Sequence, residues 1–107
     1  MPIVLSGWSF GADISLTVTD PRVAGWVAIA PPLRFRSSFE AATDRRPKHL
    51  VLAGHDEYRA PEEVVSEVAD WVATTVIVVP GASHFFVGRT DRVVDDTTAA
   101  LERITTH

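Results

Sequence analysis

A serine flanked by two glycines marks the stretch of this sequence best suited to chemistry. Gly7, Ser9 and Gly11 form a G-x-S-x-G pattern directly after the apolar run Ile3–Leu5. This spacing places a serine on a sharp turn between a strand and a helix, where neighbours without side chains let the backbone fold tightly. The turn exposes the serine hydroxyl and directs the next amide, that of Phe10, toward a developing oxyanion. The pattern therefore predicts a nucleophilic serine.

Two further polar segments follow apolar runs and supply residues that activate such a serine. Asp56 and Glu57 come after the run Leu50–Ala53, and His84 comes after the run Val76–Val79. A histidine removes the proton of the attacking hydroxyl and later protonates the leaving group, while a carboxylate holds the imidazole in the required tautomer. These residue types predict acyl transfer through a covalent intermediate.

Four apolar runs predict the elements that position these residues. The runs are rich in Val, Ile and Leu, are too short for helices and end at Gly, Pro or Ser, which favours parallel strands buried on both faces. Together with the helices between them, they predict an α/β fold with a parallel sheet of about four strands and flanking helices. The runs are Ile3–Leu5, Trp26–Ala30, Leu50–Ala53 and Val76–Val79.

Two segments have the periodicity and end signals of helices. One begins at Pro61, with two glutamates in its first turn, and the other begins with Thr90 as its N-cap. Apolar residues recur at helical spacing in both. The first stripe is Val64, Val65, Val68, Trp71 and Val72, and the second is Val93, Thr97, Ala100 and Ile104.

The segment after Gly11 carries two conflicting signals. Ile14, Leu16 and Val18 alternate with polar residues, which by period alone predicts a strand. The G-x-S-x-G pattern predicts a helix at the same place. We favour the helix because of the motif.

Composition narrows the classes of function. The 107 residues include 46% hydrophobic residues and no cysteine, and they carry a net charge of −4. This balance indicates a globular protein and argues against a nucleic acid or an anionic membrane as partner. The absence of cysteine excludes disulfides and a thiolate nucleophile. No apolar run has the length of a membrane span and no leader pattern is visible, which predicts a cytoplasmic location.

The connection 31–47 carries four arginines: Arg34, Arg36, Arg45 and Arg46. A solvated loop is the favoured interpretation, and binding of an acidic substrate group is the alternative. Its two phenylalanines are expected to be exposed. The connection is too short for a large lid, which favours a small or exposed acyl substrate.

In their order and context these segments resemble the C-terminal half of an α/β-hydrolase, and in particular small bacterial hydrolases of the dienelactone-hydrolase and esterase type. The family carries its triad in the order Ser, then Asp or Glu, then His, with each residue after a strand. The segments that carry the resemblance are 3–12, 50–61 and 78–88, and together with their spacing the resemblance covers nearly the whole chain.

The resemblance implies a triad of Ser9, Asp56 and His84, with the Phe10 amide in the oxyanion hole. Family members commonly have two residues between the glycine and the acid, whereas only His55 stands between Gly54 and Asp56. Asp56 is favoured as the acid and Glu57 is the alternative. Hydrolysis of an ester, thioester or amide through this triad needs no cofactor.

The resemblance also implies that residues 1–107 are a partial catalytic domain, in which the N-terminal strands and the first oxyanion loop are absent. The expected activity of the chain alone is therefore weak, since loss of one oxyanion donor costs about a hundredfold to a thousandfold. The alternative function is a non-catalytic fragment that pairs with a missing half or forms a homo-oligomer through an uncovered sheet edge or face.

Other chemistries are less favoured by the residues. A metal site at His55, Asp56 and Glu57 with nearby His49 is not predicted, because neighbours on a tight loop point in different directions. The glycine pattern lacks the lysine of a phosphate-binding loop. Trp8 is the candidate for lining a substrate pocket, and Phe85 and Phe86 are expected to pack beneath the histidine loop.

Overall fold

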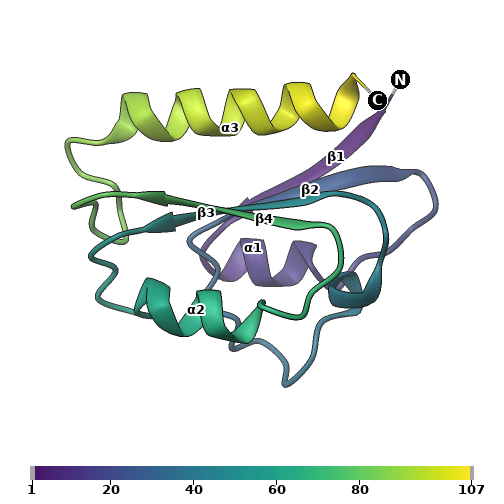
Figure 1. Cartoon of the computed structure of the whole chain (residues 1–107), viewed down its shortest axis with the longest axis horizontal. Coiled ribbons are helices and arrows are strands. Elements are labelled where there is room, and N and C mark those ends of the chain that lie inside the picture. Colours follow the sequence, from purple (N-terminus) through teal and green to yellow (C-terminus); the bar gives the residue numbers. More distant parts are fainter. Residues whose placement is uncertain (1, 107) are drawn as a thin grey trace.

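Four parallel strands in the order β1-β2-β3-β4 form the centre of the computed structural model, which describes residues 2–106 (Figure 1). Each strand pairs in parallel with the next one along the chain, so all four end at the same edge of the sheet. The predicted fold class is confirmed. The strands are β1 (Ile3–Trp8), β2 (Val23–Ile29), β3 (Lys48–Ala53) and β4 (Thr74–Val79).

Helices cover both faces of the sheet (Figure 1). α1 (Phe10–Ser15) and α2 (Pro61–Glu67) lie on one face, and α3 (Thr90–Thr105) lies on the other. The inward side chains divide into two cores, because successive residues of a strand point to opposite faces. Trp26 and Leu50 belong to the core beneath α1 and α2, whereas Val27 and Val51 belong to the core beneath α3.

Burial of the strands depends on their place in the sheet. All six residues of β3 are buried. The apolar run predicts this burial for Leu50–Ala53, and the structure adds Lys48 and His49. The same prediction is wrong for β1 and β4, where Ile3 and Val78 keep 47% and 39% of their surface exposed. β1 and β4 are the two edge strands, so the helices cover them incompletely.

Three details of the helices differ from the sequence predictions. α2 ends at Glu67, so Trp71 and Val72 lie beyond it, and Val65 and Val72 are exposed while Val64 and Val68 are buried. Thr90 is the first residue of α3 rather than its cap. The inward stripe of α3 is confirmed at Ala100 and Ile104, which are both buried.

The conflict after Gly11 is resolved in favour of the helix. In α1 the polar Asp13 and Ser15 are buried, whereas Ile14 is 40% exposed. An alternating strand would have placed these side chains the other way round. Each helical residue turns by about 100° rather than 180°, so the alternation does not describe a face of this segment.

The arginine-rich connection is held to the rest of the chain by its own charges. Arg46 pairs with Asp44 at 2.7 Å and donates to the carbonyls of Thr19, Asp20 and Val23. Phe39 is buried against Trp71, so only Phe35 of the two phenylalanines is exposed. The connection also contains a short 3-10 helix at Glu40–Thr43.

Within residues 2–106, no helix is both long enough and apolar enough to cross a membrane.

Asp13 joins α1 to the loop after β2. Its side chain is fully buried, and its two carboxylate oxygens accept three backbone N–H groups, from Leu33 at 2.9 Å, Arg34 at 2.8 Å and Phe35 at 3.1 Å. Leu33 has a left-handed φ of 56°, a conformation that costs energy for a residue with a side chain. The three bonds to Asp13 stabilise this turn and replace the hydration that the carboxylate loses.

We expect Asp13→Asn to lower the free energy of unfolding by about 1–3 kcal/mol, because an amide NH2 would replace an acceptor and face N–H donors. Urea denaturation followed by circular dichroism measures this loss. The matched control is Asp95→Asn on the exposed side of α3, which should change the value by less than about 0.5 kcal/mol. Equal effects of the two substitutions would contradict the role given to Asp13.

His49 of β3 is the buried titratable group beneath α3. The residue is 5% exposed, and its Nδ1 atom has no hydrogen-bond partner among the described residues. Asp96 and Arg103 of α3 border the same small cavity of about 160 Å³. Burial, together with the positive charge of Arg103, lowers the pKa of His49 below its ordinary value of 6.5. The folded protein therefore favours neutral His49.

This lowered pKa makes the folded state less stable in acid. As the pH falls through the ordinary histidine pKa, His49 binds a proton in the unfolded chain but stays neutral in the folded protein. The free energy of unfolding therefore decreases. We expect His49→Leu to stabilise the protein more at about pH 5.5 than at about pH 7.5, because leucine has no proton to bind. Urea denaturation at both pH values checks this, and an equal gain at both would contradict it.

Candidate active site

Ser9 occupies the sharp turn between β1 and α1. Its φ of 57° and ψ of −121° are strained for a residue with a side chain, and its amide donates to the carbonyl of Ile29 at 2.8 Å. A Cβ atom on Gly7 would lie 2.5 Å from the carbonyl carbon of Gly11, so residue 7 must be glycine. A Cβ on Gly11 would meet nothing within 4 Å, so the expected need for a bare backbone applies to Gly7 alone.

Ser9, His84 and Asp56 lie in one hydrogen-bonded row. The hydroxyl Oγ of Ser9 is 2.8 Å from Nε2 of His84, and Nδ1 of His84 is 2.7 Å from Oδ2 of Asp56. The side chains of His84 and Asp56 are only 4% and 6% exposed. A buried carboxylate on Nδ1 keeps the proton there and leaves Nε2 free to accept the serine proton. The arrangement has the geometry of an activated nucleophile.

The two candidate acids have different partners. Asp56 contacts the imidazole, and its other oxygen accepts the amides of Tyr58 at 2.8 Å and Arg59 at 3.2 Å. Glu57 instead accepts the backbone amide of His84 at 2.8 Å. This amide bond keeps the pKa of Glu57 below its ordinary value. The geometry therefore puts Asp56 on the ring of His84 and Glu57 on its backbone.

Backbone bonds join the loops that carry these residues. Gly54 donates to the carbonyl of Val79 at 2.9 Å, and His55 donates to the carbonyl of Ala82 at 2.8 Å. The pairing of β3 with β4 thus continues beyond the strands into the two loops. It holds the segment before Asp56 against the segment before His84.

Phe10 is the first residue of α1, immediately after Ser9. The amides of the first helical turn have no acceptor within their own helix, so the Phe10 N–H is available to an external oxygen. Its side chain is 56% exposed and makes an edge-on contact with Phe35, with ring centroids 5.2 Å apart. Phe10 can therefore offer one hydrogen bond to an oxyanion beside Ser9.

Aromatic side chains surround His84. The indole N–H of Trp8 donates to the carbonyl of His84 at 3.2 Å, and the rings of Trp8, Tyr58 and Phe85 contact the imidazole. Phe86 packs beneath the loop as expected, but Phe85 is 55% exposed, which corrects the prediction for that residue. Its ring lies on the surface because it packs against Trp8 and Tyr58 rather than against the core.

The sequence does not indicate the contacts that three residues make in and around the candidate site. Sequence patterns assign no role to Asp13 or Tyr58, and they indicate Glu57 only as an alternative acid. A charge between two core residues, Ala12 in α1 and Leu16 directly after it, is the available signal for Asp13. No sequence pattern indicates the contacts of Tyr58 and Glu57, because these contacts depend on how the loop after β3 packs against the loop after β4.

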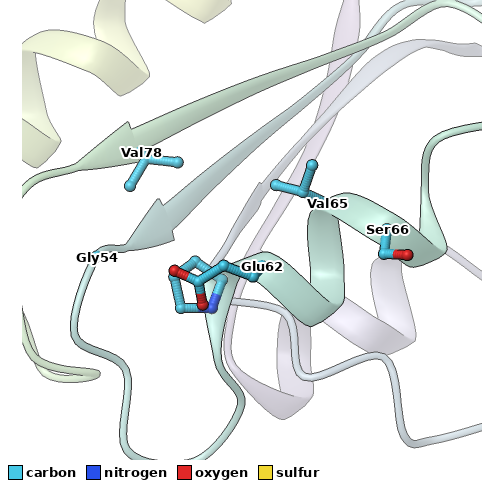
Figure 2. A pocket seen from close by; sticks show the side chains of 6 residues that line it. Gly54, Glu62, Val65, Ser66 and Val78 are labelled. Carbon is cyan, nitrogen blue, oxygen red and sulfur yellow. The ribbon is translucent and has the colours of Figure 1, made fainter.

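An apolar pocket of about 310 Å³ lies between α2 and β4 (Figure 2). Val65 and Val78 border it from the two elements, and Gly54 lies at its end. Ser9, Asp56 and His84 are not among its lining residues. The pocket is therefore separate from the hydrogen-bonded row.

Comparison with known proteins gives matches among solved structures. No protein-family model matches the chain, and no curated protein matches it either. An α/β serine hydrolase homologue from Coxiella burnetii is 34% identical, with a TM-score of 0.77 over 86% of this chain and 45% of its own. A lidless α/β serine hydrolase from Xanthomonas campestris is 24% identical, with a TM-score of 0.81 over 99% and 49%.

The esterase domain of a Rhodothermus marinus protein is 19% identical, with a TM-score of 0.77 over 95% of this chain and 60% of its own. The chain thus spans about half the length of the structures that it matches. At the lower identities the likeness shows the fold alone. This chain has the fold of the α/β-hydrolases.

Proposed function

We propose that this chain is a serine hydrolase of the esterase or acyl-hydrolase type that forms an acyl-enzyme at Ser9. The observation that carries the proposal is the row Ser9–His84–Asp56, with contacts of 2.8 and 2.7 Å and a strained backbone at the serine. Backbone strain of this kind clusters at active sites, so the conformation of Ser9 supports a functional role.

The mechanism follows from these contacts. Oγ of Ser9 attacks the acyl carbonyl carbon while its proton moves to Nε2 of His84. The Phe10 amide donates to the oxyanion, and Asp56 stabilises the imidazolium. The tetrahedral intermediate then breaks its bond to the leaving group, which takes the proton from Nε2. Water, activated by His84, attacks the acyl-Ser9 ester, and the acid and free serine are released.

The solved relatives support the reaction class. Two of them are described as α/β serine hydrolases and one as an esterase domain, but the chain spans only about half of each. The short connection 31–47 favours a small or exposed acyl substrate, and the Xanthomonas relative is described as lidless. The proposal covers esters, thioesters and amides of this size, because all three react through the same three residues.

We expect a fluorophosphonate probe to add once to the chain, at Ser9, and not to add to the Ser9→Ala variant. The probe reacts only where a serine is activated, so intact mass followed by peptide mapping tests the proposal directly. Absence of an adduct in a folded sample would refute it.

Matched carboxylate variants test the assignment of the acid. Asp56→Asn should slow labelling by at least about a hundredfold, because the amide favours the wrong tautomer of His84. Glu57→Gln should slow it much less, since Glu57 contacts the backbone of His84 rather than its ring. A larger effect at Glu57 would contradict the assignment.

A second candidate, a non-catalytic chain that associates through its sheet, is favoured by the edge strand β1. β1 lies at the end of the strand order, and Ile3 on it is 47% exposed. Edge strands present unpaired N–H and C=O groups to other chains. This candidate predicts a dimer or larger species by light scattering at micromolar concentration, which Ile3→Lys should shift toward monomer. A monodisperse monomer that also labels at Ser9 would refute it.

A further inference from the structure

Three half-exposed aromatic side chains form a cluster over the imidazole of His84. Trp8, Tyr58 and Phe85, which we call the aromatic cluster, are 44%, 55% and 55% exposed. Their ring centroids lie 5.3, 4.4 and 5.3 Å from that of His84. The rings also contact one another, because Phe85 lies 5.4 Å from Trp8 and 5.9 Å from Tyr58. They come from three separate strand ends and meet only at the candidate active site.

Polar contacts hold the ring of Trp8 and the backbone of Tyr58 in place. The indole of Trp8 donates to the His84 carbonyl, and the Tyr58 amide donates to Asp56. Grouped exposed aromatic side chains indicate a binding surface, and rings already fixed in position lose little freedom on binding. The cluster is therefore organised before a ligand arrives.

Its position beside His84 identifies the part of the substrate that it meets. This step rests on the proposed function. Nε2 of His84 gives its proton to the leaving group, so the leaving oxygen must come within hydrogen-bond distance of that atom. The substituent on this oxygen then lies beside the ring of His84, where the aromatic cluster is exposed.

The chemistry of the cluster favours a flat and neutral substituent. Phe85 makes edge-on contacts with His84 and Tyr58, with interplanar angles of 89° and 78°. A bound aromatic ring can make further contacts of this kind, and these contribute an interaction energy that a saturated ring does not gain. Arg59, next to Tyr58 in the chain, pairs with Glu67 at 3.0 Å and donates to the Pro32 carbonyl. Its guanidinium group is therefore engaged within the protein and is not directed toward an anionic group on the substrate.

We propose that the aromatic cluster binds an aromatic ring on the leaving-group side, which makes esters of arylmethyl and aryl alcohols the preferred substrates. The proposal concerns the alcohol part of the ester alone, because the leaving group is the part that takes its proton from Nε2 of His84.

The test is binding of benzyl alcohol, the product of such an ester, followed by two-dimensional NMR of the tryptophan indole N–H groups. We expect saturable movement of the Trp8 signal, while the signals of buried Trp26 and of Trp71 stay in place and report that the fold is intact. Cyclohexylmethanol, a saturated alcohol of similar size, should bind about two- to tenfold more weakly. Equal binding of the two alcohols, or an unmoved Trp8 signal, would overturn the proposal.

Paired variants locate the site. Phe85→Leu should weaken benzyl alcohol binding about two- to tenfold, since it removes an aromatic contact but keeps apolar volume. Phe35→Leu is the matched control: Phe35 is also a half-exposed aromatic residue, but it packs against Phe10 on another side of Ser9. Equal weakening by the two variants would overturn the proposal.

The readout separates this inference from the proposed function, because binding of the alcohol needs no reaction. Movement of the Trp8 signal without labelling of Ser9 would support the aromatic site and refute the hydrolase. Labelling of Ser9 without movement of the Trp8 signal would support the hydrolase and overturn the aromatic site.

Discussion

The close approach of two backbone segments at the end of β1 is the constraint on which the candidate site depends. The carbonyl group of Gly11 lies where a Cβ of residue 7 would be, only 2.5 Å from it. This contact brings α1 back against its own strand and forces Ser9 into a left-handed conformation. The strain is balanced by the bond from the Ser9 amide to Ile29 and by the burial of Ala12 and Leu16. The packing of α1 against β1 therefore holds Ser9 in its strained conformation.

Continuation of the sheet pairing beyond the strands places the other residues of the row. Backbone bonds join Ser9 to Ile29, Ala30 to Val51, Gly54 to Val79 and His55 to Ala82. Each loop at this edge thus starts from a fixed position beside its neighbour. A hydrogen-bonded row requires positions accurate to a fraction of an ångström, and fixed loop origins supply that accuracy. The side-chain bonds of Asp56 and Glu57 then hold the ring and the backbone of His84 separately.

Buried charged and polar groups of this chain differ in how their burial is compensated. Asp13 accepts three amides, and Lys48 donates from its ammonium group to two carbonyls, of Asp44 and Arg46. Both lie on the side of the sheet that carries α1 and α2. His49 lies on the α3 side, and its Nδ1 has no hydrogen-bond partner within residues 2–106. The neutral form of the ring, rather than hydrogen bonding, therefore limits the free-energy cost of its burial. The same fold therefore tolerates buried ionisable groups by two different physical means.

The sequence alone was sufficient for the four parallel strands along the chain, for the glycine-flanked serine and for the positions of Asp56 and His84 after their strands. These features depend on short-range patterns, because parallel strands and tight turns restrict which residue types occur at adjacent positions. The patterns failed at the strands β1 and β4, because burial of a strand depends on whether it lies at an edge of the sheet. They also failed at the end of α2, where the apolar stripe continues to Val72 but the helix ends at Glu67. Local sequence carries no information on which strand lies at an edge.

Only the tertiary structure decided which carboxylate faces the imidazole and which rings cover it. Asp56 and Glu57 are adjacent in the chain, and their different partners arise from the loop that lies opposite them. The contacts of Trp8, Tyr58 and Phe85 likewise join residues from three strand ends. The sequence by itself determined the residues available for chemistry and their order. The packing of the strand ends determined their distances, because those distances belong to no single segment of the chain.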